Sequence, residues 1–476
     1  MALLKVDIAA GQVSGVDDLS PAASSVVNFQ VDESNVIKPR AGLSSYSVTG
    51  LTTSKIIGLQ RWSWYTVLVD SGRSFQVISD FGPAAAVNVS DGTAGTKLEG
   101  TKTRVTWVSG SDYVYCTGGG RIQRWTTTLR NTEVISASPT CTHIASIGNY
   151  LIANDSSAPD SFRWSDIGEG AWGTWPAANT TTASARPDEI RAIYENANRL
   201  FVYGDSSVQV YEVGVDPTLP FDLIGSSDNG IGAPYAWAKL DDQCAWLDHR
   251  RRVLIGDGVS GEHVSQAIDR DLRGLTTISD CFMYREEKGQ HSLLVVRFPT
   301  EGRTFVYNMK RQSWSERKKY TAPFQGDYPV NAYVYRPSDN SHIVASTSTT
   351  GALYKIDDTV STDIGHPLVC EMTTGWQEFD TSTRKRSSRM RLMFRRGTAA
   401  QGATPGSLEI RRQDNGQPWS NWVHISAGVP DDYDTVKDIF DLNGVFTRRR
   451  YGLRWSNSDS MSIVSLHDDI TDLGVP

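Results

Sequence analysis

The chain has 476 residues, more than one hydrophobic core usually serves, so several domains are expected. Its 14 Trp, 18 Tyr, 14 Phe and 41 Gly favour half-buried pleated strands joined by turns. The net charge of −7, with the acidic excess in residues 1–370, argues against a protein whose main task is to grip nucleic acid.

Residues 1–50 are predicted to form an N-terminal arm. Short apolar runs lie there on either side of a segment rich in Ser, Ala and Gly. The turn Lys38-Pro39-Arg40-Ala41-Gly42 then stops one strand and redirects the next, since Pro interrupts strand pairing and Gly accepts turn conformations. Such an arm can supply a strand that closes the domain behind it.

Residues 51–365 repeat one pattern, in which three apolar strands are separated by polar and Gly-containing turns. The repeats begin near Lys55, Arg104, Cys141, Glu189, Trp237, Thr277 and Val330. Their spacing of roughly 40 to 50 residues is typical of propeller blades, which cannot bury their faces singly. The sequence therefore predicts an all-β protein built around a β-propeller of about seven blades. The best helical pattern, from Glu262 to Leu275, is weak.

Residues 366–476 are predicted to form a C-terminal β-sandwich. At least five short strands follow one another there without the blade spacing. Strict alternation in one of them puts two kinds of side chain on opposite faces: Arg389, Arg391, Met393 and Arg395 on one, and Met390, Leu392 and Phe394 on the other.

The arginines of this strand and a later basic run are the candidate partner-binding residues: Arg389, Arg391, Arg395, Arg448, Arg449 and Arg450. Arginine is enriched at protein interfaces and pairs well with acidic surfaces. The alternative is a solvated outer face of the sandwich without a partner.

No group of residues predicts catalysis. Adjacent acids such as Asp241-Asp242 and Asp357-Asp358 fall at turns, where Asp is common. The eight His and five Cys lack the spacing of metal ligands. We therefore expect no enzymatic activity, no metal and no cofactor. The pattern Asp414-x-Gly416-x-x-Trp419 is interpreted as a structural hairpin turn that Asp caps, that Gly permits and that Trp packs behind.

The sequence also indicates where the chain is made. It has no run of 18 apolar residues and no N-terminal segment with the basic-then-apolar order of a signal peptide. Its odd, widely spaced cysteines favour buried thiols over disulfides. We expect synthesis and folding in a cytoplasm.

Four stretches of the sequence occur in an order that is typical of one protein family. They are Val27-Asn28-Phe29 with Lys38-Pro39-Arg40-Ala41-Gly42-Leu43, the repeat Ile190–Gly214, the repeat Ser292–Trp314, and Arg448–Arg450 with Tyr451-Gly452-Leu453-Arg454. As an ordered set they resemble the packaged-DNA stabilisation proteins of short-tailed bacteriophages, which are tail accessory factors. The resemblance covers most of the chain and depends on no single motif.

This resemblance implies a virion protein that forms a hexameric ring, the tail hub or nozzle below the portal and its adaptor. The ring would extend or close the DNA exit channel and carry tail fibres, spikes or a needle. It would be assembled in the host cytoplasm and pass DNA without sequence recognition. An acidic lumen would suit such a channel, because basic walls bind phosphate strongly.

Two alternatives stay open from the residues alone. One is a propeller glycosidase or depolymerase, which needs two carboxylates about 5 to 9.5 Å apart. The other is a sugar-binding or receptor-binding tail module that uses exposed tryptophans, with Trp62, Trp64, Trp172 and Trp175 as candidates.

Overall fold

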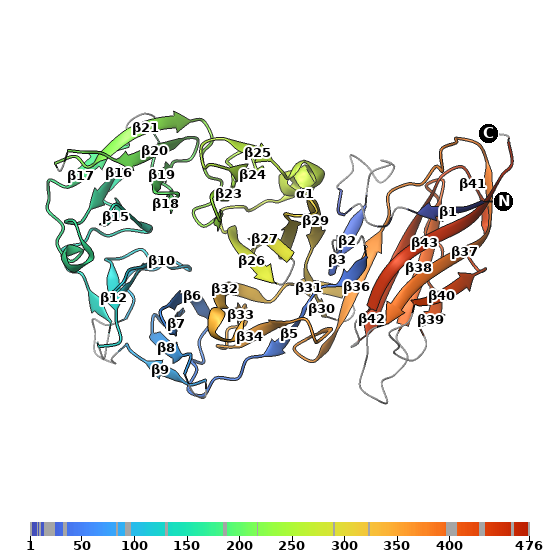
Figure 1. The fold of residues 1–476 in the computed structure, drawn as a ribbon, viewed down its shortest axis with the longest axis horizontal. Coiled ribbons are helices and arrows are strands. Elements are labelled where there is room, and N and C mark those ends of the chain that lie inside the picture. The colour runs from blue at the N-terminus through green and yellow to red at the C-terminus, as the bar shows by residue number, and fades with distance from the viewer. Residues whose placement is uncertain are drawn as a thin grey trace.

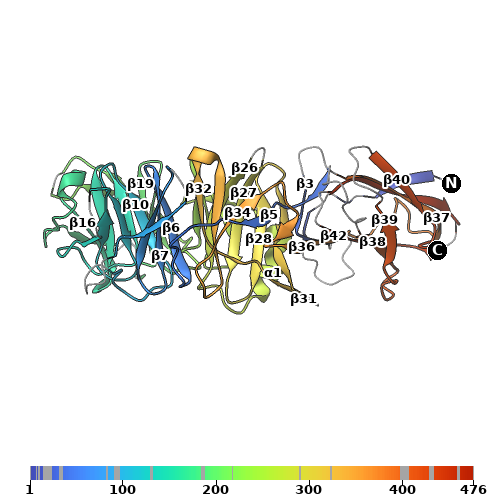
Figure 2. The same cartoon turned by 90° about the horizontal axis from the view of Figure 1, so that it is seen from below.

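The computed structural model describes residues 2–6, 8, 11–13, 24–31, 36–81, 84–90, 97–128, 132–183, 188–216, 218–288, 291–321, 324–396, 407–427, 434–457 and 461–474. These residues form mainly strands, arranged as a ring of small sheets beside a domain of two facing sheets (Figure 1). Turned by 90°, the ring and this domain lie next to each other along an elongated molecule (Figure 2).

Five blades of the ring are separate four-stranded antiparallel sheets. Blade 1 holds β6 (Ile56–Trp62), β7 (Tyr65–Asp70), β8 (Phe75–Ser79) and β9 (Ala86–Asn88). Blade 2 holds β10 (Thr106–Ser109), β11 (Val114–Thr117), β12 (Gln123–Trp125) and β13 (Glu133–Val134). Blade 3 holds β14 (Ile144–Ile147), β15 (Tyr150–Asp155), β16 (Ala158–Trp164) and β17 (Thr180–Thr182). Blade 4 holds β18 (Ala192–Asn196), β19 (Arg199–Tyr203), β20 (Val208–Val213) and β21 (Phe221–Ser227). Blade 5 holds β22 (Trp237–Leu240), β23 (Gln243–Leu247), β24 (Val253–Gly256) and β25 (Gly261–His263).

Two further four-strand units complete the ring and belong to a larger sheet. Blade 6 holds β26 (Phe282–Lys288), β27 (His291–Phe298), β28 (Arg303–Asn308) and β29 (Ser313–Glu316). Blade 7 holds β32 (Val330–Arg336), β33 (Ser341–Ser346) and β34 (Leu353–Asp357), and its fourth strand is β5 (Gly42–Ser45) from the N-terminal region. The pairing of β34 with β5 closes the ring.

The predicted repeats therefore coincide with the blades. The innermost strands begin at Ile56, Thr106, Ile144, Ala192, Trp237, Phe282 and Val330, each close to the start of a predicted repeat. This confirms the prediction of a β-propeller. Helical structure within the described residues is short: η1 (Glu169–Ala171), η2 (Gln266–Ile268), α1 (Asp269–Gly274) and η3 (Pro337–Asp339).

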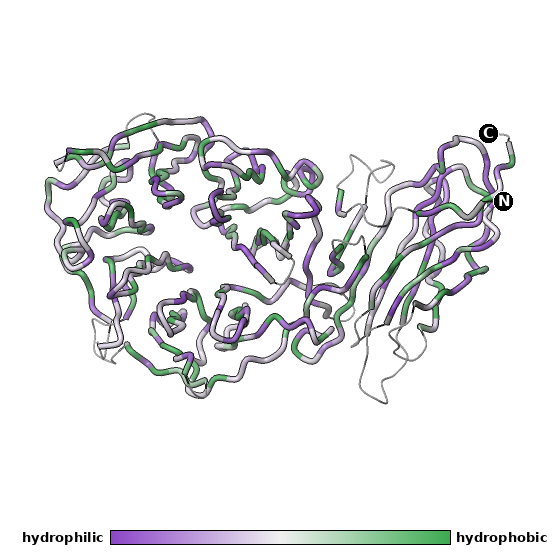
Figure 3. The backbone as a smooth tube through the Cα atoms, viewed as in Figure 1, coloured by the Kyte–Doolittle hydropathy of each residue, from purple (hydrophilic) through white to green (hydrophobic). Residues whose placement is uncertain are grey.

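Clusters of buried apolar residues lie between consecutive blades. Phe162 and Trp164 of blade 3 pack on Phe221 of blade 4, with the ring centroids of Trp164 and Phe221 5.3 Å apart. Similar clusters join blades 1 and 2, 2 and 3, 4 and 5, 5 and 6, and 7 and 1. Hydrophobic segments accordingly recur in every blade (Figure 3). Each blade depends on its neighbours to bury its faces.

The second domain consists of two facing sheets. The sheet named here the β43 sheet contains β3 (Phe29–Val31), β4 (Ile37–Pro39), β43 (Met461–Asp472), β37 (Lys385–Arg396) and β40 (Asp434–Ile439), with β1 (Ala2–Val6) on β43 and β41 (Gly444–Phe446) on β37. The β42 sheet contains β2 (Ser25–Val27), β36 (His366–Thr373), β42 (Arg449–Asn457), β38 (Ser407–Asp414) and β39 (Val423–Ser426). One core lies between them, in which Leu392 and Phe394 of β37 join Leu453 and Trp455 of β42.

Residues 1–50, predicted as an arm, are divided between the two domains. The strands β1 to β4 enter the two-sheet domain, and β5 enters blade 7. Moreover, β2 pairs in parallel with β29 of blade 6 and antiparallel with β36. Blade 6 and the β42 sheet therefore form one continuous sheet, to which the short β35 (Thr362–Asp363) also belongs. A hairpin of β30 (Lys318–Thr321) and β31 (Phe324–Asp327) links blades 6 and 7.

All five cysteines are buried, and none forms a disulfide. Among the described residues, no helix has the length and apolar character needed to cross a bilayer.

Candidate partner-binding surfaces

A cavity of about 690 Å³ lies on the propeller axis, lined by residues of the innermost strand of every blade. Much of its wall is aromatic. Tyr194 and Trp237 stack with ring centroids 4.5 Å apart, and Tyr284 and Tyr333 stack at 4.7 Å. The volume is that of a small-ligand pocket. These rings cover one another's faces, so the stacking serves packing between blades.

Charged groups at this cavity are few. Lys239 pairs with Glu195 at 3.1 Å. Arg104 lies over the ring of Phe282 and donates a hydrogen bond of 2.9 Å to the carbonyl of Asn331. Burial lowers the pKa of Arg104 to about 9, with a further contribution from the nearby positive charge of Arg297.

The described residues that line the cavity do not include the carboxylate pair usual in glycosidases. Glu195 is the one carboxylate among the described residues that line it, whereas glycoside hydrolysis ordinarily uses two. The described part of the chain also holds no cluster of His, Cys, Asp or Glu arranged to bind a metal ion.

His143 packs against two of the aromatic residues that line this cavity. Its ring packs on Tyr235 and Tyr194, and its Nε2 lies 3.0 Å from the carbonyl oxygen of Pro234. Thr142 Oγ1 lies 3.0 Å from Nδ1. Burial lowers the pKa of His143 to about 4. A neutral imidazole that donates from Nε2 to Pro234 satisfies these contacts.

We expect the free energy of unfolding to fall as the pH falls from about 6.5 to about 4, with a contribution of about 3 kcal/mol from His143. In that range the unfolded chain binds a proton at this imidazole and the folded chain does not, so acid favours unfolding. Urea unfolding at several pH values should give a steeper pH dependence for the unchanged chain than for His143→Gln. Parallel curves would show that His143 titrates normally in the folded protein.

The predicted arginine row lies on the outer face of the β43 sheet, away from its core. Arg391 pairs with Asp438 of β40 at 2.8 Å, and Arg389 lies 3.3 Å from Asp469 of β43. Arg395 is exposed at the end of the row. Residues 390, 392 and 394 point into the core as alternation predicts. This outer face is called the arginine face below.

The predicted run Arg448–Arg450 is divided between two environments. Arg449 is fully buried and pairs with Asp414 at 2.7 Å and with Asp468 at 3.2 Å. Arg448, just before β42, and Arg450, which is also buried, both stack on Trp376. Arg449 is therefore placed to hold strands together and has no exposed surface for a partner.

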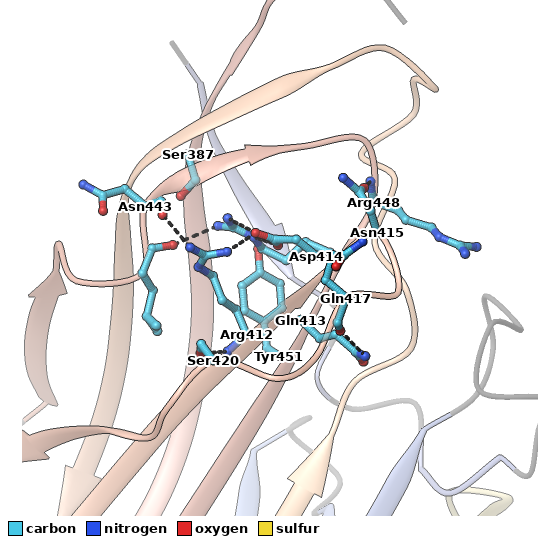
Figure 4. Close-up of polar contacts among 12 residues, drawn as sticks. Ser387, Arg412, Gln413, Asp414, Asn415, Gln417, Ser420, Asn443, Arg448 and Tyr451 are labelled. Carbon is cyan, nitrogen blue, oxygen red and sulfur yellow. Dashed lines mark hydrogen bonds and ion pairs between the residues drawn. The ribbon is translucent and has the colours of Figure 1, made fainter.

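Arg449 belongs to a polar network that links the two sheets. Figure 4 shows Ser387, Asp414 and Tyr451 of this network. Asp468 of the β43 sheet accepts hydrogen bonds from Tyr451, at 2.6 Å, and from Ser387, at 2.5 Å, besides Arg449. Burial, and next the Asp468 carboxylate, raise the pKa of Tyr451 well above its ordinary value, which keeps its hydroxyl as a donor. Arg412 pairs with Asp414 at the edge of the network.

The turn after Asp414 differs from its predicted chemistry in one respect. Asn415 and Gly416 have φ values of 50° and 77°, and the amide of Gln417 donates to the carbonyl of Asp414 at 2.8 Å. These values are those of a tight hairpin turn. The carboxylate of Asp414, however, binds Arg449 and Arg412 instead of capping the turn, because two buried or half-buried cations lie within its reach.

A stack of tryptophan and arginine on the outer face of the β42 sheet was not predicted. Arg411 lies 4.4 Å from the ring centroid of Trp419 and 4.2 Å from that of Trp422. Arg454 lies 4.3 Å from Trp422, and Glu371 pairs with both arginines. Alternation in β42 could have indicated that its outer face is basic. The two tryptophans come from a loop, so strand alternation could not have placed them on this face. The stack fastens that loop to the sheet.

The stretch Val27-Asn28-Phe29 and the turn at Arg40 meet at the seam between propeller and sandwich. Arg40 is buried and binds Asp363 through two hydrogen bonds, of 2.5 and 3.0 Å. Asn28 accepts from Arg40 Nε at 2.9 Å and donates to the carbonyl of Val369 at 2.8 Å. Asn28 has a φ of 58°, which Asn tolerates better than most residues.

The candidate tryptophan platforms are mostly covered. Trp62, Trp172 and Trp175 are buried, and only Trp64 of this group is exposed, where it packs on Phe81 with ring centroids 5.3 Å apart. Buried indole rings stabilise blades and offer no face to a sugar.

Comparison with known proteins gives one informative match. Residues 13–361 match the family described as "Bacteriophage P22 Gp10, beta-propeller". Similar solved structures include the designed Ika8 protein (13% identity, 66% of this chain and 100% of that chain, TM-score 0.39). They also include the WD40 β-propeller domain of Doa1 (9% identity, 66% and 97%, TM-score 0.42) and PorZ of Porphyromonas gingivalis (12% identity, 65% and 38%, TM-score 0.40). No curated protein matches.

Proposed function

Because this chain belongs to the bacteriophage P22 Gp10 β-propeller family, and is thus a structural protein of a phage, we propose that it forms the tail hub or nozzle. In this role it is a ring, of six copies, below the portal and its adaptor. The ring extends or closes the DNA exit channel and carries tail fibres, spikes or a needle. The observation that carries the proposal is the family match over residues 13–361, which spans all seven blades.

The rigidity of the chain supports a role in assembly. Blade 6 and the β42 sheet are joined through β2 as one sheet. The buried contacts of Arg40 and Asn28 fix the same seam. A subunit whose two domains are rigidly joined can fix the relative positions of the virion proteins that bind to each domain.

We propose further that the protein is not an enzyme. The propeller cavity has a single carboxylate, Glu195, among its described lining residues. This composition favours a structural role over the glycosidase alternative.

DNA would pass through the lumen of the ring, between copies, and not through one propeller. The propeller cavity, at about 690 Å³, has the size of a small-ligand site. The net charge of −7 suits a lumen through which DNA slides without sticking. Assembly of the ring would take place in the host cytoplasm.

Electron microscopy of the purified chain, alone and with a portal–adaptor assembly, tests the proposal. A ring, or incorporation into the portal–adaptor assembly, is the expected result. A chain that stays monomeric in both samples, and that binds or cleaves a sugar on a glycan panel, would instead establish the sugar-directed alternative.

A further inference from the structure

Exposed apolar side chains gather at the outer end of blade 4. Leu223 and Ile224 of β21 are 49% and 47% exposed, and Val215 and Leu219 in the preceding loop are exposed as well. A register shift opposite Val210 places Leu223 and Ile224 in an irregular part of the strand, where both reach solvent. We name these four residues the blade-4 patch. Apolar side chains grouped in this way are typical of interaction sites.

Acidic residues surround this patch. Asp222 lies directly opposite Glu212 in the pairing of β21 with β20, an arrangement in which like charges repel. Arg199 pairs with Glu212 at 2.7 Å. Asp216 is exposed in the same loop as Val215. Because Arg199 already pairs with Glu212, a cation brought by a partner would act mainly on Asp222 and Asp216.

The arginine face has the complementary character. Val436 and Phe440 are 46% and 58% exposed beside the arginine row, and Val445 of β41 is exposed opposite Arg386. The basic side chains of this face are Lys5, Arg386, Arg389, Arg391 and Arg395, and the described carboxylates among them are those of Asp438 and Asp469. Apolar residues ringed by arginine are a common composition of protein interfaces.

The two surfaces lie at opposite ends of the molecule. In Figure 1, β21 is at the upper left of the propeller, and β40 and β41 are at the right of the sandwich. One copy therefore cannot bring its own surfaces together. We propose that the blade-4 patch of one copy docks on the arginine face of the next copy. The proposal rests on the ring proposed above and specifies how its subunits join.

Charge favours this head-to-tail contact over a symmetric one. Two blade-4 patches facing each other would oppose Asp222, Asp216 and Glu212 with the same acids. Two arginine faces would likewise oppose arginine with arginine. A head-to-tail contact pairs acid with base and apolar with apolar. Repetition of such a contact generates a closed ring when the rotation between copies allows closure.

Two variants each remove one surface. The blade variant carries Leu223→Lys and Ile224→Lys, which place cations against the arginine face. The sandwich variant carries Val436→Glu and Phe440→Glu, which place carboxylates against the acidic patch. Each is expected to be monomeric by analytical ultracentrifugation, with self-association weakened about a hundredfold or more. The control Ile167→Lys changes an exposed apolar residue of blade 3 and should assemble normally.

Mixing the two variants gives the decisive measurement. The blade variant keeps its arginine face, and the sandwich variant keeps its blade-4 patch. An equimolar mixture is therefore expected to associate through this intact pair of surfaces, although neither variant associates alone. Circular dichroism checks folding, and for a misfolded variant the charge reversals Asp222→Arg or Arg395→Glu take its place, since they retain the apolar residues.

The outcomes separate this contact from the ring itself. If the unchanged chain forms rings and both variants do so equally well, the contact is wrong and the ring stands. A mixture that stays monomeric also overturns the contact. If the unchanged chain forms no ring, alone or with the portal–adaptor assembly, both proposals fall together.

Discussion

Replacing Arg449 with Met is expected to destabilise the sandwich by about 3–5 kcal/mol. Arg449 is the counter-ion of Asp468, which is fully buried, and of Asp414. Its removal leaves Asp468 without a cation in a core that cannot solvate it, since Tyr451 and Ser387 alone do not neutralise it, whereas Asp414 keeps Arg412. Hydrogen exchange should show the loss as reduced protection of the amides in β42 and β43.

The neighbouring variant Arg448→Met is the matched control. Arg448 is half-buried, lies just before β42 and stacks on Trp376. Its loss is expected to cost about 1 kcal/mol or less. Equal losses for the two variants would mean that the network around Asp468 does not stabilise the domain.

Replacing Arg40 with Met is expected to cost about 3–5 kcal/mol as well, but across both domains. The substitution leaves Asp363 buried without its cation and removes one of the hydrogen bonds that Asn28 Oδ1 accepts, while the one from the Lys318 amide stays. Arg40 lies between β4 of the sandwich and β5 of blade 7. Urea unfolding should therefore shift to lower concentration for the propeller and for the sandwich.

Arg273→Met supplies the comparison for this experiment. Arg273 is largely exposed and pairs with Asp269 four residues earlier. Surface pairs of this kind contribute at most about 1 kcal/mol. If Arg40→Met is as mild as Arg273→Met, or if it shifts one domain alone, the seam does not couple propeller and sandwich.

The propeller could be predicted because its pattern is local. Each blade is a series of hairpins between neighbouring strands, so alternating apolar residues and turns reveal it within about 45 residues. The start predicted near Lys55 lies one residue from β6, and the start at Val330 coincides with that of β32. The outward position of Arg389, Arg391 and Arg395 follows from alternation in the same way.

Long-range pairing could be predicted only in outline. A closing strand from the N-terminal arm is expected from the sequence, and β5 supplies it to β34, but no local pattern encodes the register of that pair or the pairing of β1 with β43. The sequence does indicate that Arg449 is buried, because alternation in β42 places it on the same face as Tyr451, Leu453 and Trp455. Its partners Asp414 and Asp468 come from other strands and needed the structure.

The closure of blade 7 by β5 has a consequence for biosynthesis. Ser45 pairs with Tyr354, so this strand leaves the ribosome roughly 300 residues before its partner. At about 5–20 residues per second, β5 waits on the order of 15–60 s with an unsatisfied edge, and β1 waits longer for β43. Blade 7 can close once β34 has left the ribosome, whereas the sandwich cannot be completed until β43 (Met461–Asp472) has been made. Premature termination near the C-terminus would therefore release a chain with exposed N-terminal strands, a substrate for chaperones or proteases instead of a smaller working subunit.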